Sequence, residues 1–438
     1  MVLREGRFGK AMNEGIEAFS SSLKKDRFLA PYDIRQSIAH ARALEKAGVI
    51  SSGDRDRIVA SLESTGRKIK QDPAYLSEGA DDIHMAIEQE LGDIGKKLHA
   101  GRSRNDQVAC DMRMYVRDSS RRLVSEIRKL LDSIDEADRV SSAKDSLIPV
   151  YTHMQRAQSV NLSAQLGAYS SWLVRDIERL EQVQKRANLL PLGSGASAGS
   201  NIKLDIAMMA DELGFEGIIR NTVDAVSGRD YVLEYASALS IFSLHLSRMA
   251  EDFIIFATKE FNFIELSDEI ADTSSIMPQK KNPDCLELVR SASARIGGNC
   301  FSLFMLMKSL PLSYNRDMQD DKLIYDAAEG ACELAGVMNT VMGNISFNRE
   351  KMKKAACSGF TDAADFAEYL VLNKTMDFRD AHRVTGMLVR EGIEKAYESI
   401  SDFSLEEIKN HVPNISKDVF EFIDPGNAVQ RRLSGRGE

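Results

Sequence analysis

The segment RSRNDQVACDMRMYVRDSSRRLVSEIRKLLDSIDEADRVSSAKDSLI, residues 102–148, contains neither glycine nor proline. Apolar side chains recur along it at steps of three and four residues, apart from one gap bridged by Ser119 or Ser120. This spacing is typical of an amphipathic helix with one apolar face. A helix of roughly 40 residues is about 60 Å long, so the segment predicts an architecture of long helices. The apolar positions are Val108, Met112, Val116, Leu123, Ile127, Leu131 and Ile134.

The rest of the chain extends this pattern into an all-α fold with three domains. We predict an N-terminal helical domain over 1–103, a central bundle of long helices over 104–355 and a C-terminal helical domain over 356–438. A long apolar stripe along one central helix needs partners outside its own chain, so the bundle is expected to form a multi-subunit helical core. The central helices are predicted near 102–148, 157–190, 229–272, 284–310 and 315–344.

In the N-terminal domain, Asp33 is a candidate cap for a helix that Gly48 ends, and two more helices are predicted over 54–70 and 81–91.

Composition narrows the possible functions. The 438 residues carry a net charge of -9, which argues against a nucleic-acid or an anionic membrane partner. No apolar run is long enough to span a membrane, and the first residues lack the apolar core of a signal peptide. The five cysteines are scattered, as expected of reduced thiols in a cytoplasmic protein. The seven histidines form no metal-binding motif, so we expect no metal site.

The string TSSIMPQKKNP, residues 273–283, lies between two predicted helices. Asn282 is a good N-cap and Pro283 a good first residue, so a helix is predicted to begin at Asp284 or just before. Lys280 lies close to that helix start, where the free N–H groups already carry partial positive charge. Such a loop is suited to bind a carboxylate. Its composition alone is also that of an ordinary solvated loop.

Three other polar segments are candidate site elements. GRSRNDQ at 101–107 opens the first long helix, and Asn105 or Asp106 can cap it to form a second anion-binding helix start. YTHMQR at 151–156 holds a lone histidine, a residue type that titrates near neutral pH. The segment 314–322 is charged between two apolar helices. Taken singly, the segment 101–107 is equally consistent with a simple capping segment, 151–156 with a surface histidine and 314–322 with a solvated turn.

These segments together resemble the argininosuccinate lyases, a branch of the fumarase and aspartase superfamily. The resemblance covers essentially the whole chain, and GRSRNDQ at 101–107 is characteristic of this branch. FSSSL at 19–23, DIH at 82–84 and FTDAAD at 360–365 match the same branch.

The resemblance implies cleavage of argininosuccinate to arginine and fumarate, without a cofactor, in a homotetramer whose sites are shared between subunits. It assigns Ser274 as the base, and His153, supported by Glu287, as the group that protonates the departing nitrogen. It leaves the reverse assignment of acid and base open. Lys280 and Asn282 would hold the substrate carboxylate. The other implied substrate-binding residues are Ser22, His84, Ser103, Arg104, Asn105, Thr152, Arg229, Tyr314, Gln319 and Lys322.

The sequence departs from the family pattern at a few positions. Thr273 stands where glycine is usual, Ser159 where proline is usual, Ala100 where threonine is common and Gly228 where an acidic residue is expected. None of these changes removes a proposed catalytic side chain, but Thr273 is expected to stiffen its loop. Two alternatives remain: a catalytically silent structural homologue of the crystallin type, and a sister lyase that acts on adenylosuccinate.

Overall fold

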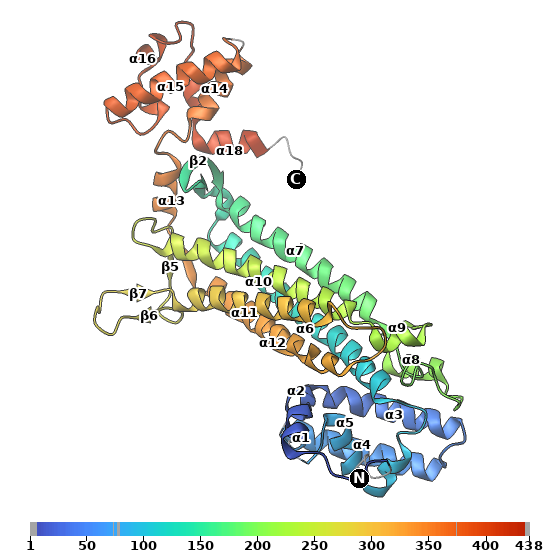
Figure 1. Ribbon diagram of the computed structural model, residues 1–438. Coiled ribbons are helices and arrows are strands. Elements are labelled where there is room, and N and C mark those ends of the chain that lie inside the picture. Colours follow the sequence, from blue (N-terminus) through green and yellow to red (C-terminus); the bar gives the residue numbers. More distant parts are fainter. Residues whose placement is uncertain (1–6, 73, 77–78, 374, 434–438) are drawn as a thin grey trace. The chain divides into compact units, whose positions relative to one another are not determined.

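The computed structural model describes residues 7–72, 74–76, 79–373 and 375–433. Helices account for most of these residues, which confirms the predicted all-α class (Figure 1). The chain divides into two compact units, each built from three separate stretches of sequence. The first unit comprises Met1–Glu126, Arg175–Leu244 and Ser291–Leu334. The second comprises Ile127–Val174, His245–Arg290 and Ala335–Glu438.

Five long helices contribute a portion to each unit. In the first unit, the hydroxyls of Ser119 and Tyr235 lie 2.6 Å apart and join two of them. In the second, Tyr169 donates to Asp252 at 2.8 Å and Ser133 donates to Asn339 at 2.6 Å. Packing between these helices is therefore present within each unit. The five are α6 (Arg104–Val140), α7 (Leu162–Ala187), α10 (Asp230–Ala257), α11 (Asp284–Met307) and α12 (Leu323–Gly343).

The first unit also holds the N-terminal helices, a glycine-rich loop over residues 193–200 with two short helices after it, and one parallel strand pair. These elements are α1 (Glu14–Ser20), α2 (Leu23–Asp26), η1 (Arg27–Leu29), α3 (Ala30–Lys46), α4 (Ser52–Gln71), α5 (Ile83–Glu90), η2 (Gly92–Lys97), β3 (Leu189–Leu190), α8 (Ile206–Leu213), β4 (Gly217–Ile218), α9 (Thr222–Ser227) and η4 (Arg316–Lys322).

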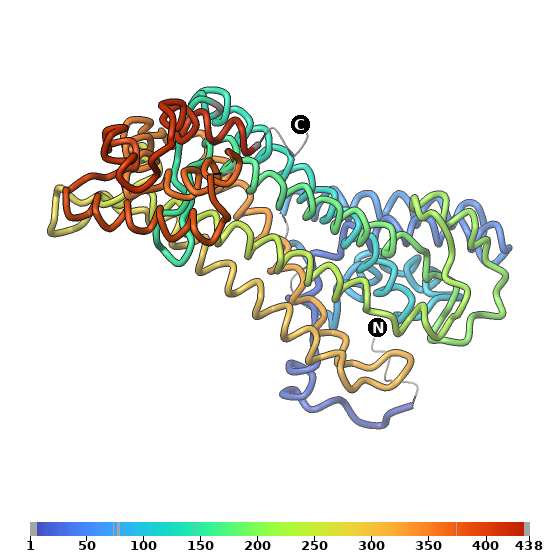
Figure 2. Tube along the Cα trace, turned by 90° about the horizontal axis from the view of Figure 1, so that it is seen from above, coloured from blue at the N-terminus to red at the C-terminus, as the bar shows by residue number. Residues whose placement is uncertain are grey.

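The second unit adds three antiparallel strand pairs and the C-terminal helices, which gather together in Figure 2. These elements are η3 (Ala143–Asp145), β1 (Leu147–Thr152), β2 (Gln155–Asn161), β5 (Ile264–Leu266), β6 (Asp272–Thr273), β7 (Lys281–Asn282), β8 (Ile345–Phe347), α13 (Arg349–Ala356), α14 (Ala363–Leu372), α15 (Phe378–Glu394), η5 (Ile400–Asp402), α16 (Leu405–Lys409), α17 (Val419–Ile423) and α18 (Pro425–Leu433).

Each unit has an apolar core of its own. In the first unit, α3, α6 and α8 enclose a cluster that includes Ala43, Met114 and Met209. In the second, the C-terminal helices enclose Phe366, Leu388 and other apolar side chains. No helix in the described part of the chain is both long and apolar enough to cross a membrane.

The N-terminal helices lie where the sequence predicts them, with one error at a cap. Gly48 follows the end of α3 with φ of 71°, a left-handed conformation that favours glycine. The predicted cap at Asp33 is wrong, because α3 begins at Ala30. Pro31 sits in the first turn, where its missing N–H costs nothing, so the helix starts earlier. Asp33 is instead buried on the helix face.

Three predicted helices run too far, because short strands take their ends. The helix predicted to reach 148 ends at Val140, and β1 begins at Leu147. The helix predicted from 157 begins only at Leu162, since residues up to Asn161 pair with β1. The helix predicted to reach 272 ends at Ala257, and β5 then pairs with β8. Both strand partners are set by tertiary contact, which a local helical pattern does not report.

The buried His40 predicts a pH-dependent stability. Its Nε2 lies 3.0 Å from the Ala100 carbonyl oxygen. Burial, followed by the charge of Arg102, lowers its pKa from 6.5 to about 3. The unfolded chain takes up this proton near pH 6.5 and the folded chain does not, so this stabilisation is full above pH 6.5 and is lost as pH falls toward 3.

The free energy of unfolding should fall between pH 7.5 and pH 5 because the unfolded chain protonates His40. We expect this fall to be about 2 kcal/mol smaller in His40→Gln than in wild type. Urea titrations at the two pH values measure this decline. The same substitution at the exposed His382 is the control and should leave the decline unchanged. An undiminished decline in the His40 variant would show that other groups cause it.

Candidate active site

Residues 272–282 of the second unit form a hairpin, with β6 and β7 as its arms (Figure 1). Ser274 lies just past β6 and is half-buried, and its Oγ accepts N–H groups from Ile276 at 3.4 Å and Met277 at 3.1 Å. Thr273 Oγ1 donates to the Lys280 carbonyl at 3.5 Å, across the base of the loop. The threonine that replaces the usual glycine therefore ties the two arms together.

The end of this hairpin leads directly into α11. The helix begins at Asp284, as the Asn282-Pro283 pair predicts. Lys280 is exposed, two residues before Asn282. Glu287 is exposed in the first turn of α11, and its Oε1 lies 3.9 Å from Arg290 Nη2. A lysine next to a helix start concentrates positive charge where free N–H groups already face outward.

His153 sits at the tip of the β1–β2 hairpin, also in the second unit. Thr152 pairs with Gln155, and the two residues between them, His153 and Met154, have φ of 54° and 58°. This left-handed pair is the signature of a tight two-residue hairpin turn. The His153 side chain is exposed and makes no hydrogen bond or ion pair within the described residues. Contacts of His153 with Ser274 or Glu287 are thus absent from the described part of one chain.

In the first unit, the start of α6 has a different cap from the one predicted. Ser103 is the cap, because its Oγ accepts the Asn105 N–H at 3.3 Å and Asp106 accepts the Ser103 N–H at 2.9 Å. The Asp106 carboxylate thus supplies one of the two bonds of a capping box, while Ser103 caps the Asn105 N–H instead of the Asp106 N–H. The Asn105 side chain is therefore not used as a cap. Its amide donates to the Ala196 carbonyl in the glycine-rich loop at 3.2 Å.

Asp106 fixes that glycine-rich loop. Its second oxygen accepts the N–H of Gly193 at 3.2 Å and of Gly195 at 2.8 Å. Burial raises the pKa of Asp106 to about 6, although these backbone donors oppose the rise. Residues 193–200 thus form a loop between β3 and α8 that a buried carboxylate positions.

Arg104 contacts the residue that caps α5, and His84 lies in the first turn of that helix. Arg104 Nε lies 3.0 Å from Asp82 Oδ2, and Asp82 caps α5 by accepting the Met85 N–H at 2.7 Å. His84, in the first turn of α5, is only 2% exposed. Its Nδ1 lies 3.1 Å from Asp33 Oδ1. His84 is thus an interior residue, and its implied role in substrate binding stays a prediction.

Asp33, His84 and Asp111 form a cluster of metal-ligand type, with ligand atoms within 4.8 Å of one another. Amide donors already engage the two carboxylates: Gln107 donates to Asp33, and Gln36 donates to Asp111 at 2.5 Å. Burial acts to raise the pKa of Asp33, but His84 and Arg102 hold it well below its usual range. Burial and the charge of Asp33 raise the pKa of Asp111. The network is only partly satisfied, because Asp33 Oδ2, Asp111 Oδ2 and both ring nitrogens of His84 are buried without a hydrogen-bond partner among the residues that the structure describes.

A second buried network joins α10 to η4. Asp321 is fully buried and accepts Arg229 Nε at 2.8 Å, and Lys322 donates to its other oxygen. Two cations around one carboxylate leave a net positive charge. Burial, and then the Asp321 carboxylate, raises the pKa of Tyr314. Gln319 accepts from Arg316 at 3.1 Å on the same turn.

Ser22 belongs to the same unit and is almost fully buried. Its hydroxyl donates to Asp26 Oδ2 at 2.6 Å. Sequence reasoning missed both Asp26 and Asp321. The four-residue step from Ser22 to Asp26, which places the two on one face of a turn, was the only signal available for the first.

The candidate residues therefore fall into two groups. In the first unit, contacts link the start of α6, the segment before α5, the Ser20–Ser22 turn and η4; Arg316, for example, donates to the Ser20 carbonyl at 2.5 Å. The first group comprises Ser22, His84, Ser103, Arg104, Asn105, Arg229, Tyr314, Gln319 and Lys322. The second group comprises Thr152, His153, Ser274, Lys280, Asn282 and Glu287.

Comparisons with known proteins identify the family. Residues 6–298 match the lyase family, and residues 360–430 match the argininosuccinate lyase C-terminal family. An argininosuccinate lyase of Acetivibrio thermocellus is 44% identical over 99% of this chain and 94% of its own length. An EDDS lyase solved in complex with formate is 28% identical, with a TM-score of 0.80 over 92% of this chain and 82% of that one. A class II fumarase from Schistosoma mansoni, 16% identical, shares the fold with a TM-score of 0.78 over 97% of this chain and 93% of its own. The chain belongs to the argininosuccinate lyase family.

Proposed function

We propose that this chain cleaves argininosuccinate to arginine and fumarate by general acid–base β-elimination. The observation that carries the proposal is the 44% identity to an argininosuccinate lyase over nearly the full length of both chains. The match of residues 360–430 to the argininosuccinate lyase C-terminal family supports this substrate over adenylosuccinate. In the reaction, a base removes a proton from the succinyl carbon beside a carboxylate, and the C–N bond on the adjacent carbon breaks.

Ser274 is proposed as the base. Its Oγ accepts hydrogen bonds from two backbone N–H groups. These bonds favour a negative charge on that oxygen, because hydrogen bonds to the charged form of an acid lower the pKa of that acid. A serine without such donors is too weak a base for this step.

Lys280 and Asn282 are proposed to meet the charge that builds on the succinyl carboxylate. Proton removal turns this carboxylate into a dianion, and preorganised donors that face developing charge are usually the largest catalytic contribution. The free N–H groups at the start of α11 add to the same positive field.

His153, with Glu287, is proposed to protonate the departing guanidino nitrogen. Its place at a hairpin tip holds the imidazole exposed and ready to contact a substrate or a second chain. The reverse assignment, with the histidine side as base and Ser274 as acid, uses the same residues.

The first-unit residues are proposed to bind the substrate, together with Thr152 of the second unit. Arg229 and Lys322, held by Asp321, supply positive charge for carboxylates. Asn105, Ser103 and Arg104 surround the start of α6. Tyr314, Gln319, Ser22 and His84 complete the proposed set.

We also infer a homotetramer whose sites combine residues of different subunits. Apolar side chains are exposed on the first-unit portions of α10 and α11, with Phe301 at 65% and Leu244 at 53%. Exposed apolar area of this kind favours burial against another copy. The three-domain division and a cytoplasmic location remain part of the proposal. The exposed residues are Ile241, Leu244, Phe301, Phe304 and Met305.

We expect Ser274→Ala to lower kcat by at least about 10²–10³, the usual cost of losing one key catalytic contact, while the oligomer stays intact. Fumarate formation followed by ultraviolet absorbance gives the rate, and light scattering gives the mass. Near-normal turnover would remove Ser274 from the mechanism. Adenylosuccinate, offered to the wild-type protein in parallel, checks the substrate assignment, and inactive wild-type oligomer would favour the structural homologue.

Mixing two inactive variants tests whether sites are shared. Ser274→Ala damages the second-unit group and Asn105→Ala the first-unit group. After joint unfolding and refolding, some sites would combine intact groups from different chains, so activity should reappear. The control is each variant refolded alone. Absence of activity from mixed oligomers of confirmed composition would place both groups in one chain.

Phe301→Asp should break the oligomer. A charge on this exposed apolar face would have to be buried unpaired in an interface, which is costly. We expect dissociation in size-exclusion chromatography with light scattering, together with loss of turnover. Lys308→Asp, at an exposed polar position just beyond α11, is the control. Unchanged mass in the Phe301 variant would contradict the proposed interface.

A further inference from the structure

Ser22 has no hydrogen-bond donor left for a ligand. Its N–H donates to the Asp81 carbonyl at 2.8 Å. Its hydroxyl donates to Asp26 Oδ2 at 2.6 Å, a short bond of the charge-assisted kind. A serine hydroxyl has one proton and two acceptor lone pairs. What Ser22 can still offer is an acceptor oxygen.

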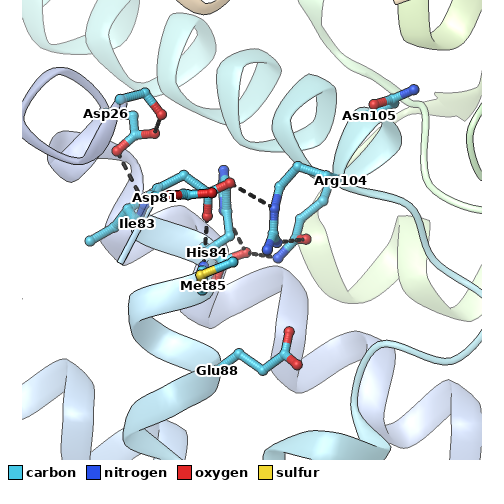
Figure 3. A network of polar contacts seen from close by, with 12 residues as sticks. Asp26, Asp81, Ile83, His84, Met85, Glu88, Arg104 and Asn105 are labelled. Atoms are coloured by element: carbon cyan, nitrogen blue, oxygen red, sulfur yellow. Dashed lines mark hydrogen bonds and ion pairs between the residues drawn. The ribbon is translucent and has the colours of Figure 1, made fainter. Parts of the chain in front are cut away.

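Asp26 holds this arrangement in place. Its other oxygen accepts the Ile83 N–H at 3.2 Å, the bond drawn between these residues in Figure 3. The carboxylate is 3% exposed, so it cannot replace a lost partner with bulk water. Turning the Ser22 hydroxyl away would leave a buried carboxylate oxygen without its donor. The Ser22 hydroxyl proton is therefore held in its hydrogen bond to Asp26 and cannot turn toward a ligand.

Resting on the proposed function, we infer that Asp26 is a positioning residue that makes Ser22 a hydrogen-bond acceptor, so that Ser22 Oγ binds an N–H of the cationic arginine portion of argininosuccinate. A carboxylate of the substrate would face the lone pairs of Ser22 and be repelled. The guanidinium and the α-ammonium are the groups of argininosuccinate that match an acceptor. Arg104, Arg229 and Lys322 can only donate, so they suit the carboxylates instead.

Product binding tests this assignment, because it separates the two portions of the substrate. Dissociation constants for L-arginine and for fumarate are measured by calorimetry on wild type, Ser22→Ala and Asp26→Asn. We expect both variants to raise the dissociation constant for arginine by at least about tenfold, the loss typical of one hydrogen bond to a charged group. The dissociation constant for fumarate should change by no more than about twofold in either variant, since no charge-assisted hydrogen bond to fumarate is lost. A merely structural role would weaken both products alike.

Matched controls complete the experiment. Ser21→Ala removes a neighbouring hydroxyl that donates to the Asp81 carbonyl at 3.1 Å but does not contact Asp26, and it should leave arginine binding unchanged. L-Norvaline keeps the ammonium but has no guanidino N–H groups, and 5-guanidinopentanoate keeps the guanidinium without the ammonium. An analogue that lacks the group bound by Ser22 should have the same dissociation constant for wild type and Ser22→Ala. This result therefore shows whether Ser22 binds the guanidinium or the ammonium.

The outcomes are distinct. Unchanged arginine binding in Ser22→Ala, or equal weakening of arginine and fumarate, would overturn the inference while the lyase assignment stands. Wild-type protein that binds neither product would overturn the proposed function and the inference with it. If Asp26→Asn does not fold, Ser22→Ala decides alone, because it removes only a hydroxyl.

Discussion

Buried carboxylates require donors, and this requirement organises the first unit around the start of α6. Asp33, Asp106 and Asp111 are all interior, and each accepts from groups in other segments of the chain. Leaving any one unpaired would cost several kcal/mol, a large share of the stability of a typical domain. Helix α3, the first turn of α5 and the glycine-rich loop are therefore held where those oxygens find partners. Of the proposed binding residues, His84 lies in α5, and Ser103, Arg104 and Asn105 lie at the start of α6.

The same principle works on a smaller scale at Asp26 and Asp321. Each carboxylate sits behind residues proposed to bind substrate, and neither is exposed enough to reach substrate freely. Asp321 separates two cations that would otherwise repel one another, and Asp26 orients a hydroxyl. Supporting carboxylates of this kind let short turns, which have little packing of their own, hold side chains in fixed directions.

Sequence reasoning recovered the helices but not what interrupts them. The α6 pattern and the start of α11 follow from local rules, periodicity and capping, which act over a few residues. The β1–β2 hairpin did not, because Asn161 pairs with Leu147 and this partner is invisible to a helical pattern. The cap at Ser103 was missed because Asn105 and Asp106 are equally good capping types, and the choice depends on which neighbours need them. Site residues came from motif resemblance, whereas their supports at Asp26 and Asp321 depend on contacts far along the chain.

The turn at His153 and Met154 has a consequence for thermal stability. Both residues adopt left-handed backbone conformations, which cost a non-glycine residue roughly 1–2 kcal/mol each. Asparagine or glycine at position 153 would relieve that cost and make the chain more robust to heat, but would remove the imidazole. Thermal stability and the proposed role of His153 in proton transfer thus favour different residues at this position.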